Sequence, residues 1–287
     1  MNQVAIMADT LSGIPPKMAD EFNIKLIPLH ILMDGKSYME TELDKDRFYA
    51  RLMQKDNLPT TSAPTAAQFL EGYRELSQKT ESIIHICYTS WIGMGYKQAM
   101  QAKSMANDEL PNTAIEVIDS RVECGAQLLC ILEAARAAAE GKSFSEVVSI
   151  VNELVPRLNS LYILDTFYYT RKGGRMGKAS IWDDSALAVK SILELDASTG
   201  GIPTPVTRTR TKAEAIRKAV ELVKNRNGNR KLHVAVSQGN TPKQAQELKR
   251  QLLSQTSIKE IYSTRISLIH AVHWSPGALR LGWFSED

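Results

Sequence analysis

Two adjacent glycines flanked by cations make residues 167–177 (FYYTRKGGRMG) the stretch of this chain best suited to bind an anion. Backbone N–H groups at Gly173 and Gly174 can approach a ligand closely, because neither residue carries a Cβ. Arg171, Lys172 and Arg175 surround the glycines with positive charge. The alternative is a basic surface loop between two domains, since most basic side chains are simply solvated.

Two further loops carry hydroxyl groups that could face the same anion. Thr61 and Ser62 lie between two prolines and Thr65 directly follows the second, and all three could donate hydrogen bonds to a carboxylate or phosphate. Helix capping and turn formation are the alternative, and Thr65 is placed to cap the following helix. Ser90 and Gly93 precede another predicted helix, where free N–H groups can form either an anion site or a tight turn.

His273 is the histidine best placed for chemistry. It lies between an apolar segment, predicted as a strand over residues 267–272, and the turn sequence WSPG. We expect it to project into a loop, where it could bind an anionic head group or move a proton. His270 is expected on the opposite face of that strand, which argues against a shared metal. The remaining histidines lie in apolar runs and are interpreted as structural.

Threonines alternate with basic residues along residues 207–212. If this segment is extended, Arg208, Arg210 and Lys212 share one face. They could form a docking patch for an acidic partner, or only a solvated basic edge.

The whole-chain composition restricts the class of protein. The 287 residues include 35 basic and 32 acidic side chains, a formal net charge of +3, which is too balanced to indicate nucleic-acid binding. The three cysteines lack metal spacing and are expected to be buried free thiols. Neither a signal peptide nor an apolar run of the ~18 residues that span a membrane is recognised, so a cytoplasmic protein is expected. No catalytic, metal or dinucleotide motif is found, which favours a binding protein without cofactor over an enzyme.

Hydrophobic patterning predicts two α/β parts. Strands alternate with helices through the first half, which indicates an open, mainly parallel sheet with helices on both faces and a ligand crevice at the carboxyl ends of its strands. The second half predicts a smaller α+β domain with an antiparallel or mixed sheet. We place the domains at residues 1–158 and 159–287, with segments allowed to cross between them, and expect the ligand between the two.

The order of these motifs resembles the DegV family. The matching segments span essentially the whole chain: Asp9-Thr10, Thr61-Ser62-Ala63-Pro64-Thr65, Ser90 to Tyr96, Val117-Ile118-Asp119-Ser120, Lys172-Gly173-Gly174-Arg175 and His273-Trp274-Ser275-Pro276-Gly277. The resemblance implies a two-domain α/β protein that holds one long-chain fatty acid in an apolar tunnel between its domains. Some members present the acid to a fatty acid kinase, so such a kinase is the implied partner.

The resemblance also implies roles for individual residues. Thr61 and Ser62 would hold the carboxylate, together with Arg175 and His273. Each buried CH₂ contributes about 0.8 kcal/mol, so an acyl chain can supply most of the affinity while the head-group contacts fix its orientation.

The chain departs from the family pattern in the second hydroxyl loop. Gly93 replaces a serine and Gly95 a threonine, so two hydroxyl groups expected to face the carboxylate are missing. A backbone N–H at Gly93, or the Ser90 side chain, could substitute for them. A second hypothesis is an enzyme related to the substrate domains of dihydroxyacetone kinases, which would handle a small carbonyl or phosphate compound through a histidine such as His273.

Overall fold

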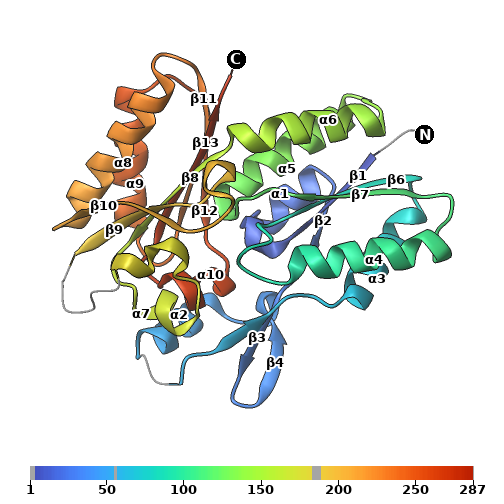
Figure 1. Cartoon of the computed structure of the whole chain (residues 1–287), viewed down its shortest axis with the longest axis horizontal. Coiled ribbons are helices and arrows are strands. Elements are labelled where there is room, and N and C mark those ends of the chain that lie inside the picture. The colour runs from blue at the N-terminus through green and yellow to red at the C-terminus, as the bar shows by residue number, and fades with distance from the viewer. Residues whose placement is uncertain (1–3, 55–56, 183–188, 287) are drawn as a thin grey trace.

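The computed structural model describes residues 4–54, 57–182 and 189–286, which form three sheets (Figure 1). The first sheet has the order β2-β1-β6-β7, and all of its strand pairs are parallel. Its strands are Val4–Asp9 (β1), Ile24–Ile27 (β2), Ser82–Cys87 (β6) and Ala114–Asp119 (β7). The predicted open parallel sheet is therefore confirmed.

Helices cover both faces of this sheet. One face packs against α3 and α4, and the other against α1, α5 and α6. Their bounds are Pro16–Glu21 (α1), Ala66–Ser77 (α3), Gly95–Glu109 (α4), Cys124–Ala139 (α5) and Phe144–Leu154 (α6). Thr65 caps α3 by accepting a hydrogen bond from the Gln68 N–H, as the capping interpretation predicted.

The second sheet is mixed and has the order β10-β9-β8-β13-β11-β12. Its pairs are antiparallel except β11 with β12. The strands are Asn159–Leu164 (β8), Lys190–Glu194 (β9), Thr204–Thr209 (β10), Leu232–Gln238 (β11), Ile258–Arg265 (β12) and Leu279–Ser285 (β13), and their outer face packs against Lys212–Asn227 (α8) and Pro242–Gln255 (α9). The predicted mixed sheet is confirmed.

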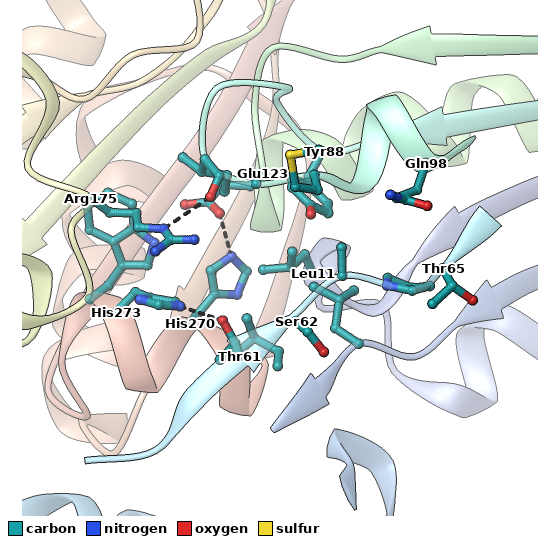
Figure 2. A pocket seen from close by; sticks show the side chains of 18 residues that line it. Leu11, Thr61, Ser62, Thr65, Tyr88, Gln98, Glu123, Arg175, His270 and His273 are labelled. Carbon is teal, nitrogen blue, oxygen red and sulfur yellow. Dashed lines mark hydrogen bonds and ion pairs between the residues drawn. The ribbon is translucent and has the colours of Figure 1, made fainter. Parts of the chain in front are cut away.

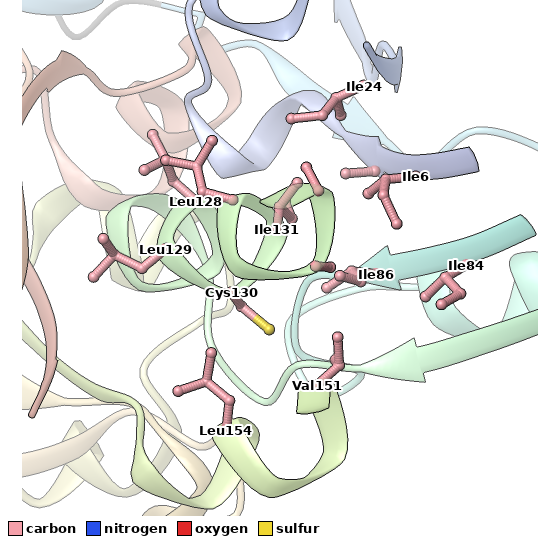
Figure 3. Packing of buried hydrophobic residues seen from close by; sticks show 14 of the residues in the cluster. Ile6, Ile24, Ile84, Ile86, Leu128, Leu129, Cys130, Ile131, Val151 and Leu154 are labelled. Atoms are coloured by element: carbon pink, nitrogen blue, oxygen red, sulfur yellow. The ribbon is translucent and has the colours of Figure 1, made fainter. Parts of the chain in front are cut away.

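Helix α5 lies between the two sheets and belongs to the core of both. Its sequence is rich in alanine and leucine, and most of its side chains are buried. Leu128 and Ile131 pack with Ile6, Ile86 and other residues of the first sheet (Figure 3). The same helix also contacts β11 and β13. The two sheets thus share one buried helix. The boundary between domains predicted at residue 158 stays a prediction.

A small antiparallel sheet, β4-β3-β5, lies beside α10 and α7 at the bottom of Figure 1. It consists of His30–Met33 (β3), Lys36–Met39 (β4) and Thr60–Ser62 (β5), while Lys45–Met53 (α2), Tyr168–Lys172 (α7) and Leu268–Trp274 (α10) are short helices. The mainly apolar sequence of residues 24–33 predicts a single strand, and this prediction is wrong, because the chain breaks at Pro28 into β2 and β3, which belong to different sheets.

The strand predicted over residues 267–272 is also wrong. Those residues belong to α10, whose first turn is capped by the Ser267 hydroxyl accepting a hydrogen bond from the His270 N–H. Residues three apart share a helix face, so His270 and His273 both reach the same cavity rather than opposite faces. Lys212 likewise begins helix α8 instead of extending the basic strand, and its ammonium group is turned inward onto Asp165, 3.2 Å away.

Candidate functional site

A cavity of about 320 Å³ lies at the carboxyl ends of the parallel strands, between the first sheet and α10 (Figure 2). This is the crevice in which open α/β sheets bind ligands. Much of its wall is apolar, formed by Leu11, Leu29, Ile92, Met94, Ile269 and Trp274. Polar side chains that reach the same cavity include Thr61, Ser62, Tyr88, Arg175 and His273.

Thr61 and His273 meet at one end of this cavity. The Thr61 Oγ1 atom lies 2.7 Å from the His273 Nε2 atom, although the residues are 212 positions apart in the chain. Burial, together with the positive charge of Arg175, lowers the pKa of His273 to about 3. The imidazole is therefore neutral near pH 7. When its Nε2–H donates to Thr61, the threonine hydroxyl keeps its own proton for a ligand.

Gly173 allows His273 to occupy this position. A Cβ at residue 173 would lie 2.2 Å from the His273 Nδ1 atom, well inside contact distance. Gly173 has a φ of −78°, so its backbone does not require glycine, and the close approach of the imidazole does. The predicted glycine-rich anion cradle is thus also the surface on which the histidine packs.

Arg175 is held at the edge of the cavity by its own neighbours. Its Nε donates to the Ile92 carbonyl oxygen, 3.1 Å away, and its Nη1 donates to the Gly173 carbonyl oxygen. These bonds connect the basic segment after α7 to the loop that precedes α4. Arg175 therefore brings a fixed positive charge beside Thr61 and His273.

Sequence reasoning missed a buried charged cluster in the cavity wall, where Glu123 and His270 are among the lining residues. The Glu123 carboxylate accepts bonds from Tyr162 at 2.6 Å, from His270 Nε2 at 3.0 Å, and from Arg280. Burial alone would raise the pKa of Glu123, but Arg280 and His270 outweigh it and hold the pKa at about 2. Because Arg280 neutralises this carboxylate, Glu123 presents little repulsion to an anionic ligand.

The predicted site residues divide into two groups. Thr61, Ser62, Gly93, Arg175 and His273 all line the cavity, and the ligand-binding role predicted for them stays a prediction. Ser90 is not among its lining residues. Its side chain is exposed, and its backbone N–H donates to the Asp119 carboxylate, 3.2 Å away.

Arg208 lies in β10, the edge strand of the second sheet, and Arg210 directly follows that strand. The Arg208 guanidinium lies over the Trp182 ring, 4.8 Å from its centroid, and donates to the Trp182 carbonyl oxygen. Arg210 is exposed. The docking role predicted for these two residues stays a prediction.

One group of potential metal ligands occurs among residues 4–54, 57–182 and 189–286: Glu133, His233 and Glu260. Arg136 forms ion pairs with both carboxylates, at 2.5 and 2.6 Å. Its guanidinium therefore already supplies the positive charge that these acids need. In the same part of the chain, no helix is both long and apolar enough to cross a membrane.

The chain thus has two sheets that share helix α5, and an apolar cavity whose polar lining includes hydroxyl, imidazole and guanidinium groups. The family model described as "Uncharacterised protein, DegV family COG1307" matches residues 3–286. The chain therefore belongs to the DegV family.

Curated relatives cover most or all of the chain. A DegV domain-containing protein of Clostridium perfringens is 31% identical over 77% of this chain and 77% of its own length. Protein DegV of Bacillus subtilis is 27% identical over 98% of both chains.

Solved structures of the family share the fold. DegV of Bacillus subtilis, described as a fatty acid binding protein, superimposes with a TM-score of 0.87 at 26% identity and full coverage of both chains. A DegV family protein of Thermus thermophilus, described by its fatty acid binding, gives a TM-score of 0.90 at 19% identity, covering 99% of this chain and 100% of that one. A stearic acid-binding protein of Eubacterium ventriosum gives 0.88 at 22% identity, covering 98% of both.

Proposed function

We propose that this protein binds a long-chain fatty acid, with the carboxylate beside Thr61, His273 and Arg175 and the acyl chain against the apolar wall. The observation that carries the proposal is the Thr61–His273 hydrogen bond beside Arg175, at one end of an apolar cavity. The hydroxyl and guanidinium groups there are donors to a carboxylate. The fatty acids bound by solved relatives support the same ligand class.

The cavity volume is consistent with a single slender ligand. About 320 Å³ lies at the lower end of the range of ~300–1,000 Å³ typical of small-molecule pockets. Each buried CH₂ contributes about 0.8 kcal/mol, so the apolar wall supplies affinity while the polar end selects the acid.

A second cavity supports presentation of the carboxylate to a partner. Thr61, Arg175 and His273 also line this cavity, of about 430 Å³, together with Tyr168 and Lys172. The polar end is thus reached from a side other than the apolar wall. We propose that a fatty acid kinase phosphorylates the acid from this side, that Arg208 and Arg210 contribute to docking that kinase, and that the protein acts as a carrier without catalysis of its own.

The ligand is tested by extracting lipids from protein purified from cells without added fatty acid and identifying them by mass spectrometry. Co-purified fatty acid, and displacement of a fluorescent fatty acid by palmitate, are the expected results. The proposal fails if neither is observed.

Arg175→Ala tests the orientation of the ligand. The variant should weaken palmitate binding by about tenfold or more, because a hydrogen bond to a charged group is lost, while hexadecanol binding should change much less. Equal losses for acid and alcohol would show that Arg175 only supports the loop at Ile92.

A further inference from the structure

Tyr88 fills the space left by the two hydroxyl groups that the second loop lacks. A Cβ at Gly93 would lie 2.7 Å from the Tyr88 hydroxyl oxygen, and a Cβ at Gly95 would lie 2.7 Å from the same oxygen and from the ring. Neither glycine has a positive φ, so the backbone itself would accept a side chain at either position. The phenol ring is what excludes side chains there.

The Tyr88 hydroxyl is held in place and faces the cavity. It accepts a hydrogen bond from the Gly95 N–H at 3.0 Å, and Gly95 is the first residue of α4, whose preceding residue Met94 offers no side-chain cap. The ring is 2% exposed and lines the cavity. Figure 2 shows it on the wall across from Thr61 and Ser62.

The phenol proton is available to a ligand. Among the residues that the structure describes, none accepts a hydrogen bond from this hydroxyl, and in the bond from the Gly95 N–H the phenol oxygen is the acceptor. Burial raises the pKa of the Tyr88 phenol, so the O–H stays protonated at physiological pH. An O–H donor with a fixed oxygen and an unused proton is suited to bind an anion.

We infer that Tyr88 donates a hydrogen bond to the carboxylate of the bound fatty acid, opposite Thr61, in place of the hydroxyl groups absent at residues 93 and 95. This inference rests on the proposed function and specifies which side chain of this protein binds the carboxylate head group. Tyr88, Gly93 and Gly95 therefore form one unit. The Tyr88 ring fits only if residues 93 and 95 are glycines, and with glycines there the Tyr88 side chain supplies the hydroxyl group.

Tyr88→Phe is the direct test, because it keeps the ring against the glycines and removes only the hydroxyl. The dissociation constant for palmitate should rise about ten- to hundredfold, with a smaller change for hexadecanol. Tyr49→Phe is the matched control. Tyr49 belongs to the same hydrophobic cluster, its hydroxyl has no hydrogen-bond partner among the described residues, and it does not line the cavity.

The outcomes separate this inference from the proposed function. If the wild-type protein binds palmitate and Tyr88→Phe binds it within twofold as well, Tyr88 has no role in head-group recognition. If the wild-type protein does not bind palmitate, the proposed function itself fails, and this role with it.

A second set of variants tests the unit if Tyr88→Phe does not fold. Gly93→Ser alone should lower the melting temperature and weaken palmitate binding, because the new side chain collides with the ring. Combining Tyr88→Ala with Gly93→Ser and Gly95→Thr should recover binding relative to Tyr88→Ala alone. A Gly93→Ser protein with unchanged stability and affinity, or a triple variant no better than Tyr88→Ala, would overturn the inference.

Discussion

His273 contributes a neutral imidazole to the site, and keeping it neutral lowers the stability of the fold at acidic pH. The unfolded chain takes up a proton on this histidine near pH 6.5, whereas burial holds the folded pKa at about 3. Between these two values the unfolded state binds more protons than the folded state. The stability that this residue contributes is therefore present above pH 6.5 and is lost as the pH falls towards 3.

His273→Gln should reveal this effect, because a glutamine amide can still donate to Thr61 but does not titrate. We expect wild type to lose stability relative to the variant by up to about 1.4 kcal/mol per pH unit below pH 6.5. Urea unfolding of lipid-free protein at pH 7.5, 6.5, 5.5 and 4.5 measures the difference. A difference that does not change with pH would contradict a buried neutral histidine.

At the scale of elements, the site depends on how two short segments meet, the glycine-containing segment after α7 and helix α10. Gly173 and Gly174 are adjacent but act differently. Gly173 has ordinary backbone geometry and packs on His273, whereas Gly174 has a φ of +67° and open space around the position of a Cβ. The two glycines therefore allow packing and backbone strain to be tested separately.

Gly173→Ala should displace the imidazole and weaken palmitate binding by tenfold or more, since the Thr61–His273 bond is broken. Gly174→Ala is the matched control, expected to lower the free energy of unfolding by about 1 kcal/mol through strain while affinity is nearly unchanged. Titration calorimetry and urea unfolding of both variants give the comparison. Loss of affinity in Gly174→Ala alone would reverse the assignment.

The elements also show where sequence reasoning succeeded and failed. The parallel sheet was predictable because short apolar runs alternate with segments of helical periodicity. Helix α10 was not, because its seven residues are all buried and a short apolar run has the same appearance in a strand or a helix. Five of the six residues predicted from the family motifs to bind the ligand line the cavity, and their role in binding stays a prediction. Tyr88 was missed because its role depends on contact with glycines five and seven positions later.

For the whole molecule, the central feature is that helix α5 packs against both large sheets. At Gly282 in β13, a Cβ would lie 2.3 Å from the Ala126 backbone nitrogen, so the strand and the helix touch through their backbones. Backbone cannot move aside as the end of a flexible side chain can. The contact between the second sheet and α5 therefore depends on that glycine.

Gly282→Ala should lower the free energy of unfolding by about 3 kcal/mol, the upper part of the range for an overpacked core. We expect unfolding to remain a single transition by circular dichroism and by tryptophan fluorescence, since both sheets lose the same helix. Two separate transitions in wild type would show that the sheets are independent.

The position of the cavity across this shared core has a practical consequence. Thr61 and Tyr88 precede α5 in the chain, while Arg175 and His273 follow it, so an occupant contacts both halves at once. Binding to the folded state alone stabilises the whole cooperative unit, by about 2.7 kcal/mol at a ligand concentration of 100 times the dissociation constant. The melting temperature measured against fatty acids of increasing length should rise with each added carbon and then level off. The acyl-chain length at which the melting temperature levels off would give the depth of the binding site in carbon atoms.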